Sequence, residues 1–230
     1  MKKLKTYFTP TELIILTVSA CLIILSHLLS HEAKLLNTAA SLIGVSSILL
    51  CAKANPIGQA LMIVFSIIYG IASFGEGYFG EMITYLGMTL PMSLLSLISW
   101  LRHPYGAGRM EVKVARLSLR AVLLCAGLCI PLTVGFYFIL GALGTSNLPI
   151  STISVSTSFI AAYLTFLRSE FYSLAYAAND LVLIILWGTA ALGDLSHLSM
   201  VICFGAFLIN DIYCYISWRR IKSRQSSDGR

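Results

Sequence analysis

Eight stretches of the chain are each long and apolar enough to cross a lipid bilayer. A bilayer core about 30 Å thick requires roughly 20 apolar residues per helix, and about 17–25 are tolerated. The stretches are residues 13–29, 35–51, 57–74, 82–100, 121–143, 150–167, 171–192 and 198–218. Because they use most of the chain, they leave no room for a separate soluble domain. The sequence therefore predicts an all-α membrane protein with eight transmembrane helices.

The composition excludes a soluble domain independently. Apolar residues make up 57% of the chain and charged residues only 11%, whereas soluble domains carry about 25% charged residues. The first stretch is too long for a removable signal peptide and lacks a small-residue cleavage site, so we expect a retained helix. The net charge of +6 does not by itself indicate nucleic-acid binding. Its meaning depends on where the basic residues lie along the chain.

The basic residues fall on one side of the eight predicted spans. Cytoplasmic loops of membrane proteins collect Lys and Arg, and fifteen of the sixteen bases here share one side, Lys34 being the exception. We therefore expect both termini to be cytoplasmic and no nucleic-acid partner. The fifteen are Lys2, Lys3, Lys5, Lys53, Arg102, Arg109, Lys113, Arg116, Arg120, Arg168, Arg219, Arg220, Lys222, Arg224 and Arg230.

Neither the cysteines nor the histidines suggest a metal or a cofactor. The cysteines lie inside or at the edge of spans, and none forms a C-x-x-C pair, which favours structural thiols in apolar packing. The four histidines lie in loops or at span ends without metal-ligand spacing. We expect no metal, no cofactor and no disulfide framework. The six cysteines are Cys21, Cys51, Cys125, Cys129, Cys203 and Cys214.

The chain contains an internal repeat. Residues 60–102 align without a gap on residues 178–220 at an offset of 118, and 13 of the 43 positions are identical. Parallel repeats of this kind are a transporter architecture, with the substrate site near mid-membrane between them. We expect five segments: an N-terminal extra helix in 1–34, a three-helix repeat in 35–101, a basic loop and linker helix in 102–148, a second repeat in 149–218 and a basic cytoplasmic tail in 219–230.

Polar and aromatic side chains inside the spans predict the substrate site. A carboxylate at mid-bilayer costs roughly 2.5–3.5 kcal/mol on insertion scales, and Asp180 lies halfway along its span. Aromatic faces and amides suit a small, flat, neutral-to-cationic solute with hydroxyl groups. A phosphate fits poorly, since no Arg or Lys lies inside a span. The candidate residues are Gln59, Tyr69, Tyr85, Tyr176, Asn179, Asp180, Trp187, Asn210, Asp211 and Tyr213. Hydrogen bonding between helices is the alternative role for each polar one.

Three further residues have expected roles outside the site. Pro91 falls inside the fourth span, where a proline removes a backbone hydrogen bond and kinks the helix, so we expect a hinge that opens and closes the cavity. Trp100 and Trp218 each lie at a helix end beside Arg, which predicts the interfacial aromatic belt of a membrane protein.

Three segments resemble the PnuC family of bacterial nicotinamide riboside transporters. They are residues 55–100, AANDLVLIILWG at 177–188 and FLINDIYCYISW at 207–218. The run GEMITYLGMTLPMSL within the first of them is the most specific part, and the likeness covers residues 35–222. The resemblance implies a SWEET-like fold of three plus one plus three helices after an extra helix, in the bacterial cell membrane. It also implies a homotrimer and facilitated diffusion of nicotinamide riboside, with a cytoplasmic kinase trapping the solute by phosphorylation.

Several functions remain open at this level. Sister branches of the family carry thiamine or riboflavin, which are also flat and aromatic. Transport coupled to protons through Asp180 or Asp211 is a second alternative. An intramembrane hydrolase is disfavoured, because the chain has no H-E-x-x-H motif and no nucleophilic Ser or Cys with a His partner.

Overall fold

The computed structural model describes residues 7–29, 35–75, 82–106, 110–145, 147–193 and 198–228 of the chain. Those residues form eight α-helices and one π-helical turn, which confirms the all-α prediction. The elements are α2 (Pro10–Leu29), α3 (Leu35–Ala52), α4 (Pro56–Gly75), the π turn η1 (Thr84–Thr89), α6 (Leu90–Arg102), α7 (Leu119–Ala142), α8 (Leu148–Phe166), α9 (Tyr172–Ala191) and α10 (Leu198–Ser227).

The helices occupy the eight predicted apolar stretches. Within the described residues, six helical segments are long and apolar enough to cross a membrane: those of α2, of η1 with α6, and of α7, α8, α9 and α10. The apolar parts of α3 and α4, Thr38–Ala52 and Pro56–Ala72, are shorter by the same measure. The protein is therefore a multi-pass membrane protein, and six of the eight predicted spans are confirmed by length and composition.

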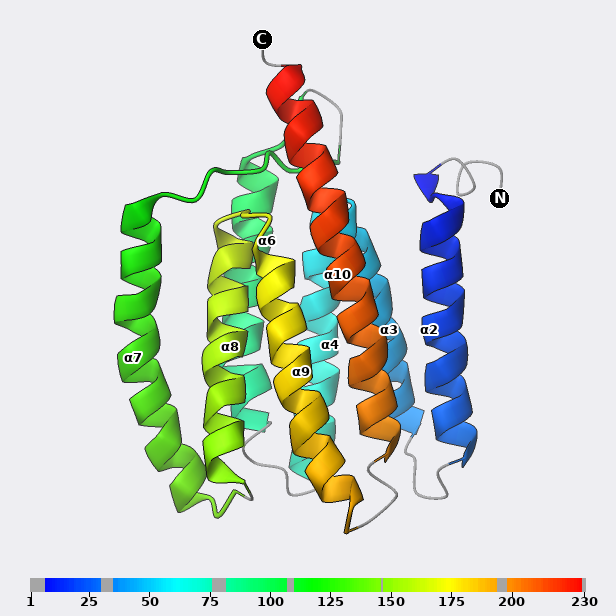
Figure 1. Cartoon of the computed structure of the whole chain (residues 1–230), viewed down its shortest axis with the longest axis vertical. Helices are drawn as coiled ribbons and strands as arrows, with labels where there is room; N and C mark the ends of the chain where they lie inside the picture. Colours follow the sequence, from blue (N-terminus) through cyan, green and yellow to red (C-terminus); the bar gives the residue numbers. More distant parts are fainter. Residues whose placement is uncertain are drawn as a thin grey trace.

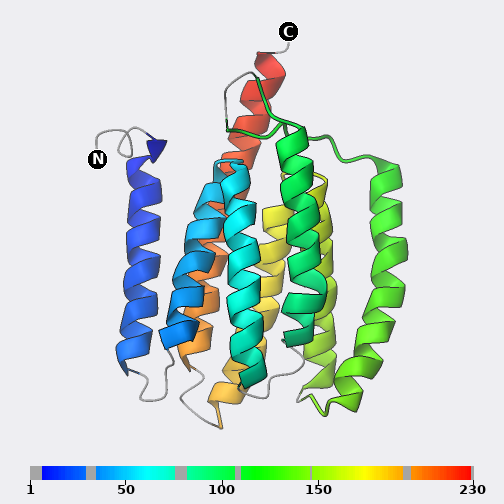
Figure 2. The same cartoon turned by 180° about the vertical axis from the view of Figure 1, so that it is seen from behind.

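Six of the helices close into a ring. Each helix contacts the next in the order α3, α4, α6, α8, α9 and α10, and α10 contacts α3 again. Two helices lie outside the ring, α2 against α3 and α10, and α7 against α8. Figures 1 and 2 show α2 and α7 at opposite edges of the bundle. The ring leaves a central space that side chains from six helices can line.

The turn between α3 and α4 brings the two helices into close contact. Pro56 begins α4, where its missing N–H is tolerated, and the Asn55 Oδ1 accepts a hydrogen bond from the Ile57 N–H at 2.9 Å. Gly58 then faces α3: a Cβ atom there would lie 2.5 Å from Cys51 Sγ and 2.6 Å from the backbone N of the same residue. Only glycine fits this contact.

The predicted basic loops gather at one end of the bundle, where α2 begins and α10 ends (Figure 1). Val112 in the loop after α6 is fully buried, and its N–H donates to the Ala54 carbonyl after α3 at 2.8 Å. The Ala115 N–H donates to the Arg168 carbonyl after α8 at 3.0 Å. Hydrogen bonds thus join three loops that are far apart in the sequence. We call this region the basic end.

The residues expected to form a basic tail continue the last helix, because α10 extends past the apolar stretch to Ser227. Contacts with the basic end explain the extra turns. Arg224 forms an ion pair with Glu111 at 2.5 Å, and Lys222 pairs with Glu170, whose side chain is 2% exposed. The Gln225 Oε1 accepts a hydrogen bond from the Val114 N–H at 2.9 Å.

The prediction that Trp100 and Trp218 form an interfacial belt was wrong. Both residues are 0% exposed, and their rings lie 5.3 Å apart at the centre of the basic end. Each indole N–H donates to a backbone carbonyl of another helix. A belt tryptophan would face lipid headgroups, whereas these two rings are enclosed between the helices.

Pro91 is placed in the first turn of α6, directly after the π turn η1. A proline cannot donate a backbone hydrogen bond, and π-helical geometry before it is one way in which a helix accommodates the loss. A π-helical segment therefore precedes Pro91, and the predicted kink is not tested by it. The role of Pro91 as a hinge stays a prediction.

Candidate functional site: a cavity inside the helix ring

A cavity of about 430 Å³ lies inside the ring, which is in the range of pockets that bind small molecules. Every helix of the ring except α6 contributes to its wall, and η1 takes the place of α6 there. Seven of the ten predicted site residues line the cavity: Gln59, Tyr85, Tyr176, Asn179, Asp180, Trp187 and Asp211. Two repeated parts of the sequence, whose equivalent positions are 118 residues apart, therefore meet at one space.

Two carboxyl groups face the cavity from neighbouring helices. Asp180 on α9 and Asp211 on α10 are each 4% exposed, and both line the cavity. The Asp180 carboxyl interacts with the Asp211 carboxyl, and its buried Oδ2 atom accepts no hydrogen bond from an N–H or O–H donor in the described part of the chain. A buried oxygen without such a donor is costly, so this oxygen is available to a ligand that donates a hydrogen bond or carries positive charge.

Asn179 is held in place from α8. Its Oδ1 accepts hydrogen bonds from the Thr157 hydroxyl at 2.8 Å and from the Ser154 hydroxyl at 3.2 Å. Because both bonds use the carbonyl oxygen, the amide N–H groups remain as the donors that Asn179 can offer to a ligand. The neighbouring positions 179 and 180 thus present a donor and an acceptor to the same cavity.

Aromatic rings form the opposite wall, which is built from α4 and η1. Phe65 and Tyr85 line the cavity, and their ring centroids lie 5.7 Å apart in an edge-to-face arrangement. Tyr69 is not among the lining residues; it stacks on Phe65 at 5.5 Å and contacts Tyr85 at 4.5 Å. Tyr69 therefore supports the aromatic wall from behind.

Two other predicted site residues point to α2 instead of the cavity. The Asn210 side-chain amide donates to the Ser19 hydroxyl at 2.9 Å and to the Ala206 carbonyl at 2.7 Å. The Tyr213 hydroxyl donates to the Glu12 carboxylate at 2.9 Å. These contacts match the alternative role of hydrogen bonding between helices. They fix α10, and with it Asp211, against the extra helix.

The sequence-based prediction missed α8 completely. Ser151, Ser154 and Ser158 line the cavity, and their spacing of three and four residues puts them on one face of a helix. That stripe of hydroxyls in an apolar span was a usable signal. Tyr172 was also not included, although it lines the cavity and its hydroxyl is hydrogen bonded to Cys214 Sγ at 2.9 Å.

The two ends of the cavity differ in exposure. At the end away from the basic loops, the lining residues Leu143, Gly144 and Asn147 are exposed. At the end nearer the basic loops, Cys51 and Tyr172 line the cavity with 4% and 3% exposure. The cavity is therefore accessible from the α7–α8 loop and closed towards the basic end.

The charge of the lining decides which solutes fit. Among the described residues that line the cavity there are two aspartates and no Lys, Arg or His. Phosphate groups in proteins are usually bound by arginine, lysine or helix N-termini. The arrangement can hold a flat ring between aromatic side chains, donate and accept hydrogen bonds, and stabilise a positive charge. It offers no cation to neutralise a phosphate.

A model of a known protein family, described as the nicotinamide mononucleotide transporter family, matches residues 34–220. The chain belongs to this family. The matched region contains α3 to α9, α10 up to residue 220 and every residue that lines the cavity, while α2 precedes it. The PnuC resemblance seen in the sequence is thereby confirmed, and the protein is a member of a transporter family, not of an enzyme family.

Characterised relatives in the family are distant but cover most of the chain. A nicotinamide riboside transporter PnuC from Neisseria mucosa is 24% identical over 196 residues, which is 83% of this chain and 74% of the relative. The Haemophilus influenzae nicotinamide riboside transporter PnuC is 22% identical over 185 residues, or 79% of this chain and 77% of the relative.

A solved structure shares the fold of this family member. The crystal structure described as the vitamin B3 transporter PnuC superposes with a TM-score of 0.79 at 20% sequence identity. The match covers 95% of this chain and 94% of that chain. The helix arrangement of the family is therefore present here almost in full.

Proposed function

We propose that the protein transports nicotinamide riboside across the bacterial cell membrane by facilitated diffusion. The observation that carries the proposal is the cavity inside the ring, with its aromatic wall, Asn179, and the buried carboxyl group of Asp180. Nicotinamide riboside has a flat pyridinium ring with a positive charge, a carboxamide and ribose hydroxyls. The two relatives named as nicotinamide riboside transporters, from Neisseria mucosa and Haemophilus influenzae, support the same solute.

The family description names the mononucleotide, which carries a phosphate. The absence of Lys, Arg and His among the described lining residues favours the unphosphorylated riboside for this chain. Phosphorylation by a cytoplasmic kinase would then keep the solute inside the cell, because the product no longer fits the cavity. Uptake becomes one-directional without any coupling in the membrane.

The proposed mechanism is alternating access between two parallel three-helix units in a SWEET-like arrangement. The units are residues 35–101, containing α3, α4 and α6, and residues 149–218, containing α8, α9 and α10; residues 102–148 hold the linker helix α7. The ring supports this division. Its two contacts between the units, α10 with α3 and α6 with α8, each join the third helix of one unit to the first helix of the other. Rocking of one unit against the other would open the cavity to each side in turn.

The orientation and assembly are part of the proposal. Cytoplasmic loops collect Lys and Arg, so the basic end is placed in the cytoplasm together with both termini, and the cavity is accessible from outside. Basic residues there would also attract anionic lipid headgroups. A homotrimer is proposed from the resemblance to the family.

The decisive experiment measures uptake of labelled nicotinamide riboside into liposomes that contain the purified protein. We expect saturable uptake that unlabelled riboside inhibits and that the mononucleotide inhibits at least tenfold less well. Thiamine and riboflavin serve as further competitors. Saturable transport of thiamine or riboflavin without transport of the riboside would assign the chain to a sister branch instead.

Proton-coupled transport is a second candidate, because Asp180 and Asp211 both face the cavity while buried. Buried carboxyl groups at mid-membrane are typical of proton relays. A protonophore separates the two mechanisms in vesicles without kinase. Facilitated diffusion predicts that the final concentrations inside and outside become equal and that a protonophore changes nothing, whereas concentrative uptake that the protonophore abolishes would favour coupling.

Replacement of Thr157 by Val should weaken solute binding by releasing Asn179. The change removes the shorter of the two hydrogen bonds to the Asn179 Oδ1. A neutral hydrogen bond contributes about 1 kcal/mol, so we expect the KM for uptake to rise about fivefold. Thr152→Val is the matched control, since the Thr152 hydroxyl donates only to the Leu148 carbonyl of its own helix. Equal KM values for the two variants would contradict this role of Thr157.

Replacement of Pro91 by Ala tests the proposed hinge. Alanine restores a backbone N–H next to the π turn, which favours a regular α-helix through η1 and stiffens the region. We expect solute exchange to slow severalfold while the equilibrium dissociation constant stays the same. Exchange at the rate of the unmodified chain would exclude a hinge at this position.

A further inference from the structure

A serine and a tryptophan recur at equivalent positions of the two units. Ser99 and Trp100 lie near the end of α6, and Ser217 and Trp218 lie on α10 at the offset of 118 residues that relates the repeats. The Ser99 hydroxyl donates to the Phe166 carbonyl at 2.9 Å, and the Trp100 indole N–H donates to the Thr165 carbonyl at 2.9 Å. Both acceptors belong to the last turn of α8.

The second pair makes the corresponding bonds to the other unit. The Ser217 hydroxyl donates to the Ala52 carbonyl at 2.7 Å, and the Trp218 indole N–H donates to the Cys51 carbonyl at 2.7 Å. Both acceptors belong to the last turn of α3. Carbonyls in the last turn of a helix lack a complete set of intrahelical partners, so each pair caps the first helix of the opposite unit. We call the four residues Ser99, Trp100, Ser217 and Trp218 the serine–tryptophan latch.

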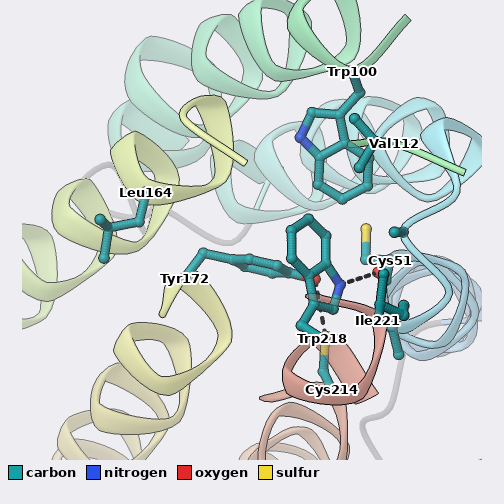
Figure 3. Packing of buried hydrophobic residues seen from close by; sticks show 10 residues of the cluster. Cys51, Trp100, Val112, Leu164, Tyr172, Cys214, Trp218 and Ile221 are labelled. Atoms are coloured by element: carbon teal, nitrogen blue, oxygen red, sulfur yellow. Dashed lines mark hydrogen bonds between the residues drawn. The ribbon is translucent and has the colours of Figure 1, made fainter. Parts of the chain in front are cut away.

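The latch lies directly beyond the closed end of the cavity. Figure 3 shows the two indole rings beside Tyr172 and the Trp218 hydrogen bond to Cys51. The Tyr172 and Trp218 ring centroids are 4.9 Å apart, and Tyr172 itself lines the cavity. The two fully buried tryptophans therefore lie next to the cavity wall on the side of the basic end.

We propose that the serine–tryptophan latch is the gate of the cavity at the basic end, and that both of its halves open in each transport cycle. The inference rests on the proposed transport function and assigns a role to four residues outside the solute site. All four hydrogen bonds cross between the units, so a single rocking motion lengthens them together. The bonds within each unit are untouched by that motion.

A reversible cross-link tests the gate. With the six native cysteines replaced by Ser or Ala, Ala52→Cys and Ser217→Cys place two thiols across one half of the latch, where mass spectrometry confirms the disulfide. We expect oxidation to reduce uptake of nicotinamide riboside at least tenfold and a reductant to restore it. The matched control is Thr133→Cys with Ser156→Cys, whose hydroxyls lie 2.7 Å apart between α7 and α8; its uptake should not change on oxidation. Undiminished uptake by the oxidised latch variant would overturn the proposal.

A labelling experiment tests the gate without a cross-link. Cys214 is 0% exposed and lies beside Tyr172 and Trp218. In a chain that retains Cys214 as its single cysteine, we expect a membrane-impermeant maleimide added at the basic end to react several times faster after Trp100→Phe with Trp218→Phe. This double change keeps an aromatic ring at each position, but it replaces the indole with the smaller phenyl ring and removes the two N–H donors. An unchanged labelling rate would contradict the latch. If neither the unmodified protein nor its variants take up the riboside, the proposed function is contradicted. The labelling rate would still decide whether the latch opens.

Discussion

Replacement of Asp180 by Asn is expected to raise the KM for nicotinamide riboside roughly 10- to 100-fold, because hydrogen bonds to a charged group contribute about 1.5–3 kcal/mol. Asp180 lines the cavity, and its buried Oδ2 accepts no hydrogen bond from an N–H or O–H donor among the described residues. Asparagine has nearly the same shape but no charge. The loss therefore reports the attraction between the carboxylate and the pyridinium ring.

Two comparisons make this measurement specific. The exposed Asp228 at the end of α10, which accepts a hydrogen bond from Tyr105 at 3.1 Å, provides the matched control Asp228→Asn, and its KM should stay within a factor of two of the unmodified chain. The reduced dihydropyridine form of the solute has no positive charge, so its KM should respond less to Asp180→Asn. An equal response of both solutes would show that Asp180 supports the helix bundle and does not recognise charge.

Replacement of Gly58 by Ala is expected to destabilise the protein by about 3 kcal/mol, at the upper end of the range for overpacked sites. The new methyl group would lie 2.5 Å from Cys51 Sγ, 2.6 Å from the Cys51 backbone N and 2.9 Å from the Ser47 carbonyl. Because two of these three contacts are with backbone atoms, rotation of a side chain cannot relieve them, and α3 has to move away from α4.

The measurement is the melting temperature in detergent together with the yield of monodisperse protein. A chain of this size loses about 2–4 °C per kcal/mol, so we expect a decrease of several degrees. Gly127→Ala on α7 is the control, since nothing lies within 4 Å of a Cβ atom there and alanine favours a helix over glycine. Equal melting temperatures for the two variants would contradict the close contact at Gly58.

Much of the fold was predictable because hydrophobic length and charge are local properties of the sequence. Runs of about 20 apolar residues gave the positions of the helices, and the placement of the bases anticipated the basic end. The length of α10 was not predictable in this way. Its last turns depend on Glu111 and Glu170, which come from two distant loops, and such long-range ion pairs leave no local pattern.

The candidate site was predicted in part for a related reason. Asp180 and Asp211 are exceptional inside apolar spans, so they stand out in the sequence. Serine and threonine are common in membrane helices, where they hydrogen bond to their own backbone, so no single hydroxyl of α8 stood out and only their spacing marked the stripe. Asn210 has the same appearance as Asn179, and only the position of α2 distinguishes them. Trp100 and Trp218 lie at helix ends beside Arg, as belt residues do, and only the packing of the opposite unit against them shows that they are buried.

The closed ring also constrains how the protein is made. Chains are synthesised from the N-terminus, and early segments fold before later ones exist. The contact of α3 with α10 joins the first and last helices of the ring, and the Trp218 donor follows its acceptor Cys51 by 167 residues. Until α10 has been inserted, the end of α3 lacks these partners and the cavity has no complete wall. Assembly intermediates should therefore remain targets for membrane quality-control proteases until the final helix enters the bilayer.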